Sequence, residues 1–394
     1  MHWKSLLGLL KRLQRTPNKN DCVTIVGKRV QDSDCTSITC STKNSEQIST
    51  ETIAEPQVQR ALVVAQKGKY EVRDDFPMPV VADGEIMIRC DFAGLNPIDW
   101  KSVDYNFCLP EFPWVTGREM SGTIEQIGSD SADFKIGDKV WTSTYYRDVR
   151  AGCFQKYVVV PAHTVSHVPK GMTMASAACL GVPALTAAMT LWKWLNVPLP
   201  SESSGQVEQL KDEWLLIWGG STSTGQFATQ FAAISGLKVI TVNSQSTKAL
   251  SEKLGATHVV VRDGKSDSEL VEEIRLVTNG DITRAIDLVS SKTAAISLQA
   301  VSQESPVHFA PLALMSSSQV VPGNVSAHTV EMKQYVLDST NKGYADELNK
   351  IMSEGKIEMP EILHIEGGLE AVPAGLDILK KGNMGGKKLV AKIY

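Results

Sequence analysis

The chain is poor in three features that mark large classes of proteins: paired cysteines, aromatic side chains and charge of one sign. Its seven cysteines are an odd number and form no Cys-x-x-Cys pair, so neither a disulfide framework nor a zinc knuckle is indicated. Aromatic residues make up 6% of the chain and the net charge is −4. Base-stacking platforms and bulk attraction to nucleic acid are therefore excluded. The unpaired cysteines favour a reducing compartment, so a cytoplasmic location is expected.

Long apolar runs are also scarce. One long uncharged stretch, residues 171–192, is long enough to raise the question of a membrane span. It contains Gly181, Pro183 and several Ser and Thr residues, which lower its apolar density. We therefore expect it to be buried between two domains of a soluble protein, with no membrane span.

The first 56 residues differ from the rest. Residues 1–20 carry five basic side chains and no acid, with leucines at helical spacing. This pattern resembles a mitochondrial presequence, which makes mitochondria the alternative location; a disordered extension or a misassigned start are the other interpretations. Residues 22–56 are rich in Ser, Thr, Asn, Gln and Asp, so the extension 1–56 is expected to be disordered.

From residue 57 onward, two patterns follow each other. Up to about residue 183, short strand candidates such as 85–90 are separated by glycines, which predicts a β-rich, barrel-like domain. After that, strands and helices alternate: 214–218, then 226–235, then 238–242. This alternation is typical of a doubly wound parallel sheet covered on both faces, so the predicted fold class is α/β with two domains.

A glycine-rich turn lies between the first strand and the first helix of the predicted sheet. Backbone N–H groups and the positive end of a helix dipole meet at this position, where they bind a diphosphate. Against the pattern G-x-G-x-x-G, the turn has Gly220 and Gly225 but Thr222 at the middle glycine. The residues expected to bind a dinucleotide here are Gly219, Gly220, Ser221, Thr222, Ser223, Thr224 and Gly225.

The end of the second strand of this sheet bears on the choice of cofactor. An NAD site usually has an Asp or Glu there, whereas this chain has Asn243 and Ser244, with Lys248 and Arg262 nearby in sequence. A carboxylate would repel a 2′-phosphate, while hydroxyl groups and cations bind it. We therefore expect NADP(H), held by Ser244, Lys248 and Arg262; the alternative is that the two cations are ordinary surface charges.

Residues 57–394 resemble the medium-chain dehydrogenase/reductase superfamily. The resemblance rests on the glycine turn and on six further short motifs in the expected order: 94–99 (Gly-Leu-Asn-Pro-Ile-Asp), 117–124 (Gly-Arg-Glu-Met-Ser-Gly-Thr-Ile), 137–140, 152–157, 185–187 and 254–259. It implies a GroES-like β-barrel catalytic domain, residues 57–183 and 335–394, interrupted by a Rossmann NADP-binding domain, residues 184–334.

Within that superfamily, the chain is most similar to the zinc-free quinone reductase-like and fungal trans-acting enoyl reductase branches. Zinc members ligate the metal through a Cys after the first glycine turn and a His in Gly-His-Glu, and here these positions hold Asn96 and Arg118. Neither an amide nor a guanidinium is a useful zinc ligand, so no metal is expected.

The resemblance implies reduction of an activated C=C bond (enoyl or enone) or a quinone with NADPH, in secondary metabolism. The substrate would be a small molecule or a carrier-bound acyl chain, and the protein a monomer or homodimer. An NADP-dependent alcohol or aldehyde dehydrogenase and a non-catalytic nucleotide-binding member are the alternatives. Candidate catalytic residues are Asn96, Tyr105 and Thr186, although Asn96 also fits a turn cap and Thr186 a helix cap. Tyr145 and Tyr146 are weaker candidates.

Overall fold

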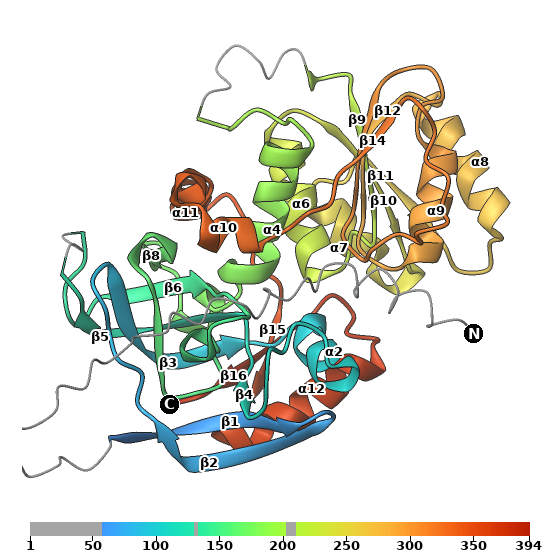
Figure 1. Ribbon diagram of the computed structural model, residues 1–394. Coiled ribbons are helices and arrows are strands. Elements are labelled where there is room, and N and C mark those ends of the chain that lie inside the picture. Colours follow the sequence, from blue (N-terminus) through green and yellow to red (C-terminus); the bar gives the residue numbers. More distant parts are fainter. Residues whose placement is uncertain (1–56, 130–132, 202–209) are drawn as a thin grey trace, which may run out of the picture. The chain divides into compact units, whose positions relative to one another are not determined.

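A parallel sheet and two largely antiparallel sheets make up the described part of the chain (Figure 1). The computed structural model describes residues 57–129, 133–201 and 210–394. The expectations for residues 1–56, namely the presequence-like segment and the disordered extension, lie outside these residues.

The parallel sheet has six strands in the order β11-β10-β9-β12-β13-β14. Its strands and helices alternate along the chain as the sequence predicts, which confirms the doubly wound α/β fold. The strands are β9 (Trp214–Trp218), β10 (Lys238–Asn243), β11 (His258–Val261), β12 (Ile282–Asp287), β13 (Val307–Pro311) and β14 (Val325–Ala327). The helices are α6 (Ser223–Ile234), α7 (Lys248–Lys253), α8 (Asp267–Thr278) and α9 (Ser291–Ala300).

Strand β9 shows why a continuous apolar run forms the centre of this sheet. Leu215 and Ile217 pack in the hydrophobic cluster that includes α6, while Leu216 and Trp218 pack in the cluster that includes α8 and α9. Successive side chains of a strand point to opposite faces, so a strand covered on both faces needs apolar residues at every position.

The first part of the chain forms the β-rich domain. A seven-stranded sheet has the order β15-β16-β3-β5-β6-β8, with β7 on β3, and a three-stranded sheet has the order β2-β1-β4. The strands from the first part are β1 (Val58–Gln66), β2 (Lys69–Pro77), β3 (Glu85–Gly94), β4 (Trp114–Val115), β5 (Glu119–Ile127), β6 (Lys139–Ser143), β7 (Tyr157–Pro161) and β8 (Val165–His167). Helix α2 (Pro97–Tyr105) follows β3 directly.

The end of the chain returns to this seven-stranded sheet. After β14 come α10 (Lys333–Leu337), α11 (Lys342–Ser353), β15 (Ile362–Ile365), α12 (Val372–Lys381) and β16 (Lys388–Lys392). Strand β16 pairs antiparallel with β3, as expected for a barrel domain that the nucleotide-binding domain interrupts. The limits at residues 183 and 334 stay a prediction, because the cluster around α6 also includes Ala177 before them and Tyr335 and Ile351 after them.

The long uncharged stretch forms a continuous helical run, Met174–Trp194, which has the length and composition to cross a membrane. Its elements are α3 (Met174–Ala177), η3 (Leu180–Ala184), α4 (Leu185–Met189) and η4 (Thr190–Trp194), and η3 contains Pro183. Of its most apolar 18 residues, 83% are buried inside the structure, which is the burial expected of a helix in the core of a protein.

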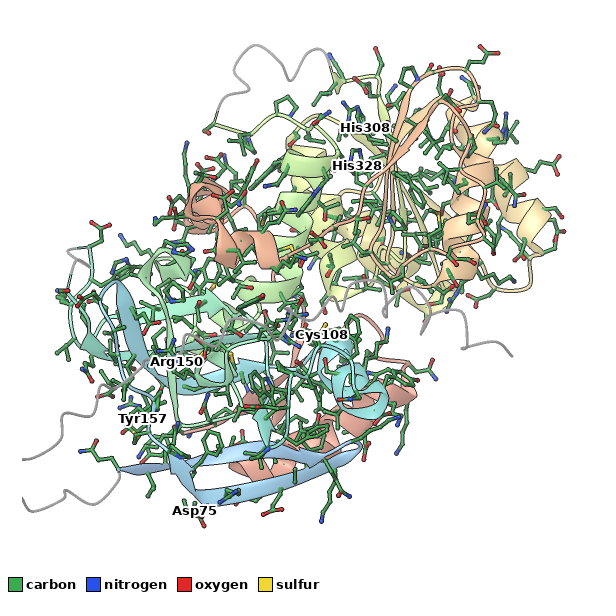
Figure 2. All side chains as sticks on the ribbon, viewed as in Figure 1. Asp75, Cys108, Arg150, Tyr157, His308 and His328 are labelled. Carbon is green, nitrogen blue, oxygen red and sulfur yellow. The ribbon has the colours of Figure 1, made fainter. Side chains whose placement is uncertain are left out.

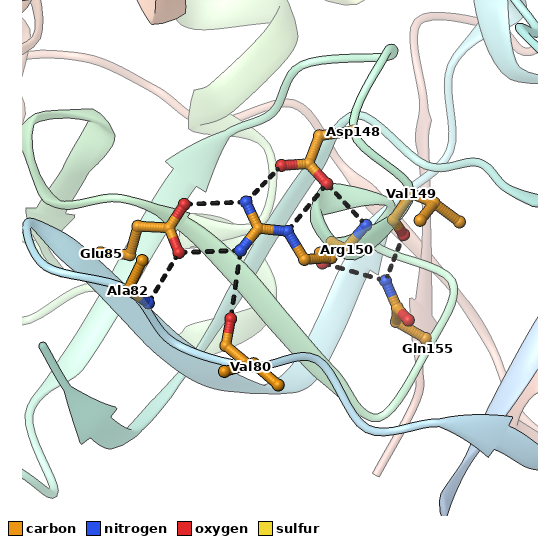
Figure 3. A network of polar contacts seen from close by, with 7 residues as sticks. All are labelled: Val80, Ala82, Glu85, Asp148, Val149, Arg150 and Gln155. Carbon is orange, nitrogen blue, oxygen red and sulfur yellow. Dashed lines mark hydrogen bonds and ion pairs between the residues drawn. The ribbon is translucent and has the colours of Figure 1, made fainter. Parts of the chain in front are cut away.

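Two polar contacts fix parts of the fold away from the glycine turn. At the β13–β14 edge, the imidazoles of His308 and His328 stack with centroids 5.3 Å apart (Figure 2). In the β-rich domain, Arg150 binds both carboxylate oxygens of Glu85, each at 2.8 Å, and also binds Asp148 (Figure 3). This Arg150 network ties the segment after β6 to the first residue of β3, and the Arg150 contact lowers the pKa of Glu85.

Candidate active site

The glycine turn has the backbone geometry that a phosphate-binding turn needs. Gly219 has φ +92°, and a Cβ on Gly225 would lie 2.3 Å from the carbonyl oxygen of Gly219. A Cβ on Gly220 would lie 2.7 Å from Cβ of Thr241. Larger residues at these positions would push α6 away from the end of β9, so the three glycines allow the helix and the strand to approach each other.

Thr222, the residue that departs from the glycine pattern, caps helix α6. Its Oγ1 accepts a hydrogen bond from the backbone N–H of Gly225 at 3.0 Å. The N–H groups of the first helical turn have no acceptor within the helix, so those of Ser223 and Thr224 stay available for an anion. A threonine at this position is therefore compatible with the predicted diphosphate site.

Asn243, at the end of β10, is hydrogen-bonded to the glycine turn. It is 3% exposed, and its Oδ1 accepts from the backbone N–H of Ser221 at 3.2 Å, while its Nδ2 donates to Ser251 Oγ. Sequence reasoning did not assign this residue to the site. The available signal was a polar residue at the end of an otherwise apolar strand.

The surroundings of β10 fit an NADP(H) site. Ser244 Oγ lies 3.0 Å from Thr247 Oγ1. The backbone N–H of Arg262 donates to the carbonyl oxygen of Asn243, so the ends of β10 and β11 lie side by side. Lys248 is half-buried, and its ammonium lies 3.7 Å from Glu252 Oε1. Arg262, together with Lys265 and Lys292, lines a cavity of about 370 Å³. Ser244 and Arg262 thus directly follow two neighbouring strands, while Lys248 is not among the residues that line this cavity; binding of a 2′-phosphate by all three stays a prediction.

One acidic residue in this region was not foreseen. Asp263 accepts a hydrogen bond from the backbone N–H of Gln245, directly after Ser244. It brings a negative charge close to the expected 2′-phosphate position.

The second part of the site is the turn between β3 and α2. Asn96 is the N-cap of α2, and its backbone N–H donates to Asp99 Oδ2 at 2.8 Å. Pro97 is the first helical residue, where its missing N–H costs no hydrogen bond. The sequence motif Asn-Pro-Ile-Asp therefore specifies the start of this helix.

A buried group of charges holds the side chain of Asn96. Lys388 Nζ donates to Leu95 O at 2.9 Å, to Asn96 Oδ1 at 2.8 Å and to Glu119 Oε1 at 2.7 Å. Asn96 Nδ2 donates to Glu119 Oε1 at 2.9 Å, and Glu119 Oε2 accepts from the N–H of Val182 at 2.8 Å. The Lys388 and Glu119 side chains are 4% and 0% exposed. We call Lys388, Glu119 and Asn96 the Lys388 network; sequence reasoning missed its two charged members.

Arg118 lies beside this network. Its Nη2 reaches Ser102 Oγ at 3.4 Å, and its guanidinium carbon lies 4.8 Å from the ring centroid of Tyr146. Burial lowers the pKa of Arg118, and burial raises the pKa of Asp99 to about 7 although the nearby Arg118 charge opposes that rise. Among the described residues, no group of three or more His, Cys, Asp and Glu could hold a metal.

The structure does not bring all the candidate catalytic residues together. Tyr105 is the last residue of α2, 45% exposed, with its ring tilted against Trp100. It is separated from Asn96 by the length of a nine-residue helix, roughly 13 Å. Thr186 is buried inside α4, whose N-cap is Ala184, so the alternative interpretation of Thr186 as a helix cap is wrong. Tyr145 packs beside Tyr146.

Comparison with known families agrees with this arrangement. Residues 82–170 match the alcohol dehydrogenase GroES-like domain, and residues 223–348 match the zinc-binding dehydrogenase family. Among curated relatives, the trans-enoyl reductase himH of Aspergillus japonicus is 30% identical over 78% of this chain and 90% of its own length. The trans-enoyl reductase resD of Aspergillus sclerotiorum is 28% identical over 85% of this chain and 100% of its own length.

Solved structures show the same fold. The quinone oxidoreductase from Coxiella burnetii has a TM-score of 0.67 and 26% identity, covering 86% of this chain and 100% of that one. The Escherichia coli quinone oxidoreductase complexed with NADPH has a TM-score of 0.69 and 18% identity, covering 84% and 99%. The chain therefore belongs to the medium-chain dehydrogenase/reductase superfamily, in its zinc-free enoyl and quinone reductase-like branch.

Proposed function

We propose that the protein is an NADPH-dependent reductase of an activated C=C bond, in an enone or enoyl compound, or of a quinone. The observation that carries this function is the glycine turn at the end of β9, with Thr222 capping α6 and Asn243 supporting the turn. The amide and hydroxyl groups after β10 and the nearby cations favour NADPH over NADH.

When bound, the cofactor supplies a hydride. The chain's own residues would bind and orient it: the N–H groups of the glycine turn hold the diphosphate, and Ser244, Lys248 and Arg262 hold the 2′-phosphate. For the acceptor, we keep Asn96, Thr186 and, as an optional proton donor, Tyr105 as candidate catalytic residues. The Lys388 network fixes the turn that carries Asn96, and its hydrogen bonds hold the Asn96 side chain in one orientation.

This chemistry requires little of the protein besides placement and a hydrogen bond. A conjugated acceptor delocalises the incoming negative charge onto its oxygen, and a fixed donor stabilises that charge. Asn96 and Arg118 occupy the positions at which zinc members bind their metal, and an amide or a guanidinium can donate a hydrogen bond there but cannot ligate zinc. Reduction of an already activated acceptor fits this donor set better than oxidation of a simple alcohol.

We further propose that the natural acceptor is a carrier-bound acyl chain, that the protein acts as a monomer or homodimer, and that it is cytoplasmic. Support for the first comes from the curated relatives, which are named trans-enoyl reductases. Light scattering would give the oligomeric state. Fusion of residues 1–56 to a fluorescent protein would distinguish a cytoplasmic from a mitochondrial location.

The test of the main function is NADPH oxidation, followed by absorbance, with a panel of enones, enoyl thioesters, quinones and aldehydes. We expect turnover with the first three classes. Efficient oxidation of primary alcohols with NADP⁺, with no turnover of enones or quinones, would overturn the proposal.

A further inference from the structure

The hydrogen bonds around Asn96 are complete. The ammonium of Lys388 has three N–H groups, and all three have acceptors: Leu95 O, Asn96 Oδ1 and Glu119 Oε1. The amide of Asn96 donates to Gly94 O and Glu119 Oε1. A substrate carbonyl would have to break one of these bonds to receive a hydrogen bond from Asn96.

The polar side chains of Asp99, Thr116 and Arg118, next to the Lys388 network, lack some of their hydrogen bonds. Three of their buried atoms, Asp99 Oδ1, Thr116 Oγ1 and Arg118 Nε, have no hydrogen-bond partner among the described residues. We call Asp99, Thr116 and Arg118 the Arg118 cluster. A buried polar atom left without a partner costs about 1–3 kcal/mol, and more if it is charged. The Arg118 guanidinium therefore has an unused N–H group in a buried position, where it would bind a hydrogen-bond acceptor strongly.

The guanidinium of Arg118 is buried beneath side chains that are themselves only partly buried. Arg118 is 7% exposed, and the ring of Tyr146 lies over its guanidinium. Cys108 is only partly buried and lies three residues beyond the end of α2 (Figure 2), close enough for the Arg118 charge to lower the pKa of its thiol against the effect of burial. A small planar group could reach Arg118 past Tyr146 and Cys108 by displacing side chains that solvent already touches.

We propose that Arg118 donates a hydrogen bond to the carbonyl oxygen of the acceptor and stabilises the negative charge that develops on it. This inference rests on the proposed function and specifies its electrophile. A fixed guanidinium polarises a carbonyl by donating hydrogen bonds to its oxygen, the same effect that a metal ion has as a Lewis acid. Asp99 is close enough for its charge to act on the guanidinium, and its Oδ2 accepts a hydrogen bond from the backbone N–H of Asn96.

NADPH, when bound, would supply the hydride that the β-carbon of the acceptor receives, and would leave as NADP⁺. The π electron pair of the C=C bond moves toward the carbonyl, whose oxygen becomes an enolate oxygen hydrogen-bonded to Arg118. A water molecule then protonates the α-carbon and is left as hydroxide, and the carbonyl is restored in the saturated product.

A stabilising donor of this kind matters most for weak acceptors. Removing one donor from an oxyanion site costs about 10²–10³ in kcat. An enone or enoyl thioester needs that help, whereas a quinone of high reduction potential accepts a hydride readily without it. The factor by which kcat falls when Arg118 is replaced should therefore depend on the acceptor. A merely structural role of Arg118 would not produce that dependence.

The experiment compares wild type with Arg118→Met and Arg118→Lys, using saturating NADPH and either an enone or a high-potential quinone. We expect Arg118→Met to lose about 10²–10³ of kcat on the enone and less than tenfold on the quinone, with Arg118→Lys in between. NADPH binding, followed by tryptophan fluorescence, should stay within about twofold. Arg150→Met is the matched control: it removes an arginine of the same domain, should lower the melting temperature, and should leave the enone-to-quinone rate ratio unchanged.

Equal losses on both acceptors, or an Arg118→Met variant with full enone activity, would overturn the role of Arg118 while the proposed function stands. Failure of the wild type to reduce any acceptor, although it binds NADPH, would instead overturn the proposed function.

A second measurement needs no variant. The infrared C=O stretch of a bound saturated ketone, labelled with carbon-13, should shift to lower frequency than in water if the guanidinium donates to it. An unshifted or raised frequency would contradict the proposal even if Arg118→Met does not fold.

Discussion

Lys388 and Asn96 are 292 residues apart in the chain and are joined by a hydrogen bond of 2.8 Å from Nζ to Oδ1. Through this bond the last strand, β16, fixes the turn that begins α2. The same ammonium pairs with the fully buried carboxylate of Glu119. The return of the chain to its first domain therefore positions a candidate catalytic turn as well as completing a sheet.

We expect Lys388→Met to destabilise the protein by about 3–5 kcal/mol, because it leaves the Glu119 carboxylate buried without its partner. Urea unfolding would measure the loss. Lys387→Met is the control, since the neighbouring lysine pairs with Glu361 on the surface, where a salt bridge contributes at most about 1 kcal/mol. Similar losses for the two variants would show that the buried pair has no special weight.

For the cofactor, Lys248→Ala should weaken NADPH binding roughly tenfold or more and leave NADH binding nearly unchanged, since a charge-assisted phosphate contact is worth about 1.5–3 kcal/mol. The exposed contact of Lys248 with Glu252 is weak, so its ammonium is available. Fluorescence titration with each cofactor gives the ratio. Lys253→Ala, at the other end of α7, is the control. Equal affinity of the wild type for both cofactors would refute the assignment.

Metal analysis is an independent test. We expect the purified protein to contain no stoichiometric zinc and to keep its activity in a chelator, because the resemblance puts Asn96 and Arg118 where zinc members have their ligands, and neither side chain is a useful zinc ligand. One tightly bound zinc per chain, measured by elemental analysis, would falsify this expectation.

What the sequence predicts well is local. An apolar run and three glycines within twelve residues predict the strand β9 and the turn after it, while the helix begins at Ser223, three residues before the predicted start, because Thr222 caps it. The Lys388 network depends on pairing between strands far apart in the chain, and no local pattern marks Lys388 or Glu119 as partners of Asn96. Only the register of β16 on β3 brings them together.

The position of Tyr105 leads to a prediction about proton donation. A general acid contributes about 10²–10⁴ to the rate, whereas Tyr105 lies at the far end of α2 from Asn96. We therefore expect Tyr105→Phe to slow the enzyme less than tenfold, with no change in the pH profile of kcat. Steady-state kinetics across pH tests this. A loss of 10² or more with a displaced profile would make Tyr105 the proton donor.

The stacked pair at the sheet edge predicts how stability depends on pH. Nδ1 of His308 lies 3.0 Å from Nε2 of His328. Burial lowers the pKa of both; the Arg284 charge lowers the pKa of His308 further, opposed by Glu213, and the charge of His308 lowers that of His328. The folded state therefore favours neutral imidazoles, while the unfolded chain binds protons near pH 6.5.

The contribution of this pair should be complete above pH about 6.5 and should be lost as the pH falls below it, because only the unfolded state then takes up protons readily. We expect the melting temperature of His328→Gln to fall less than that of wild type between pH 7.5 and 5. His364→Gln, which removes an exposed histidine of β15, should keep the wild-type pH dependence. If His328→Gln keeps it too, the pair is not the source of acid sensitivity at this edge.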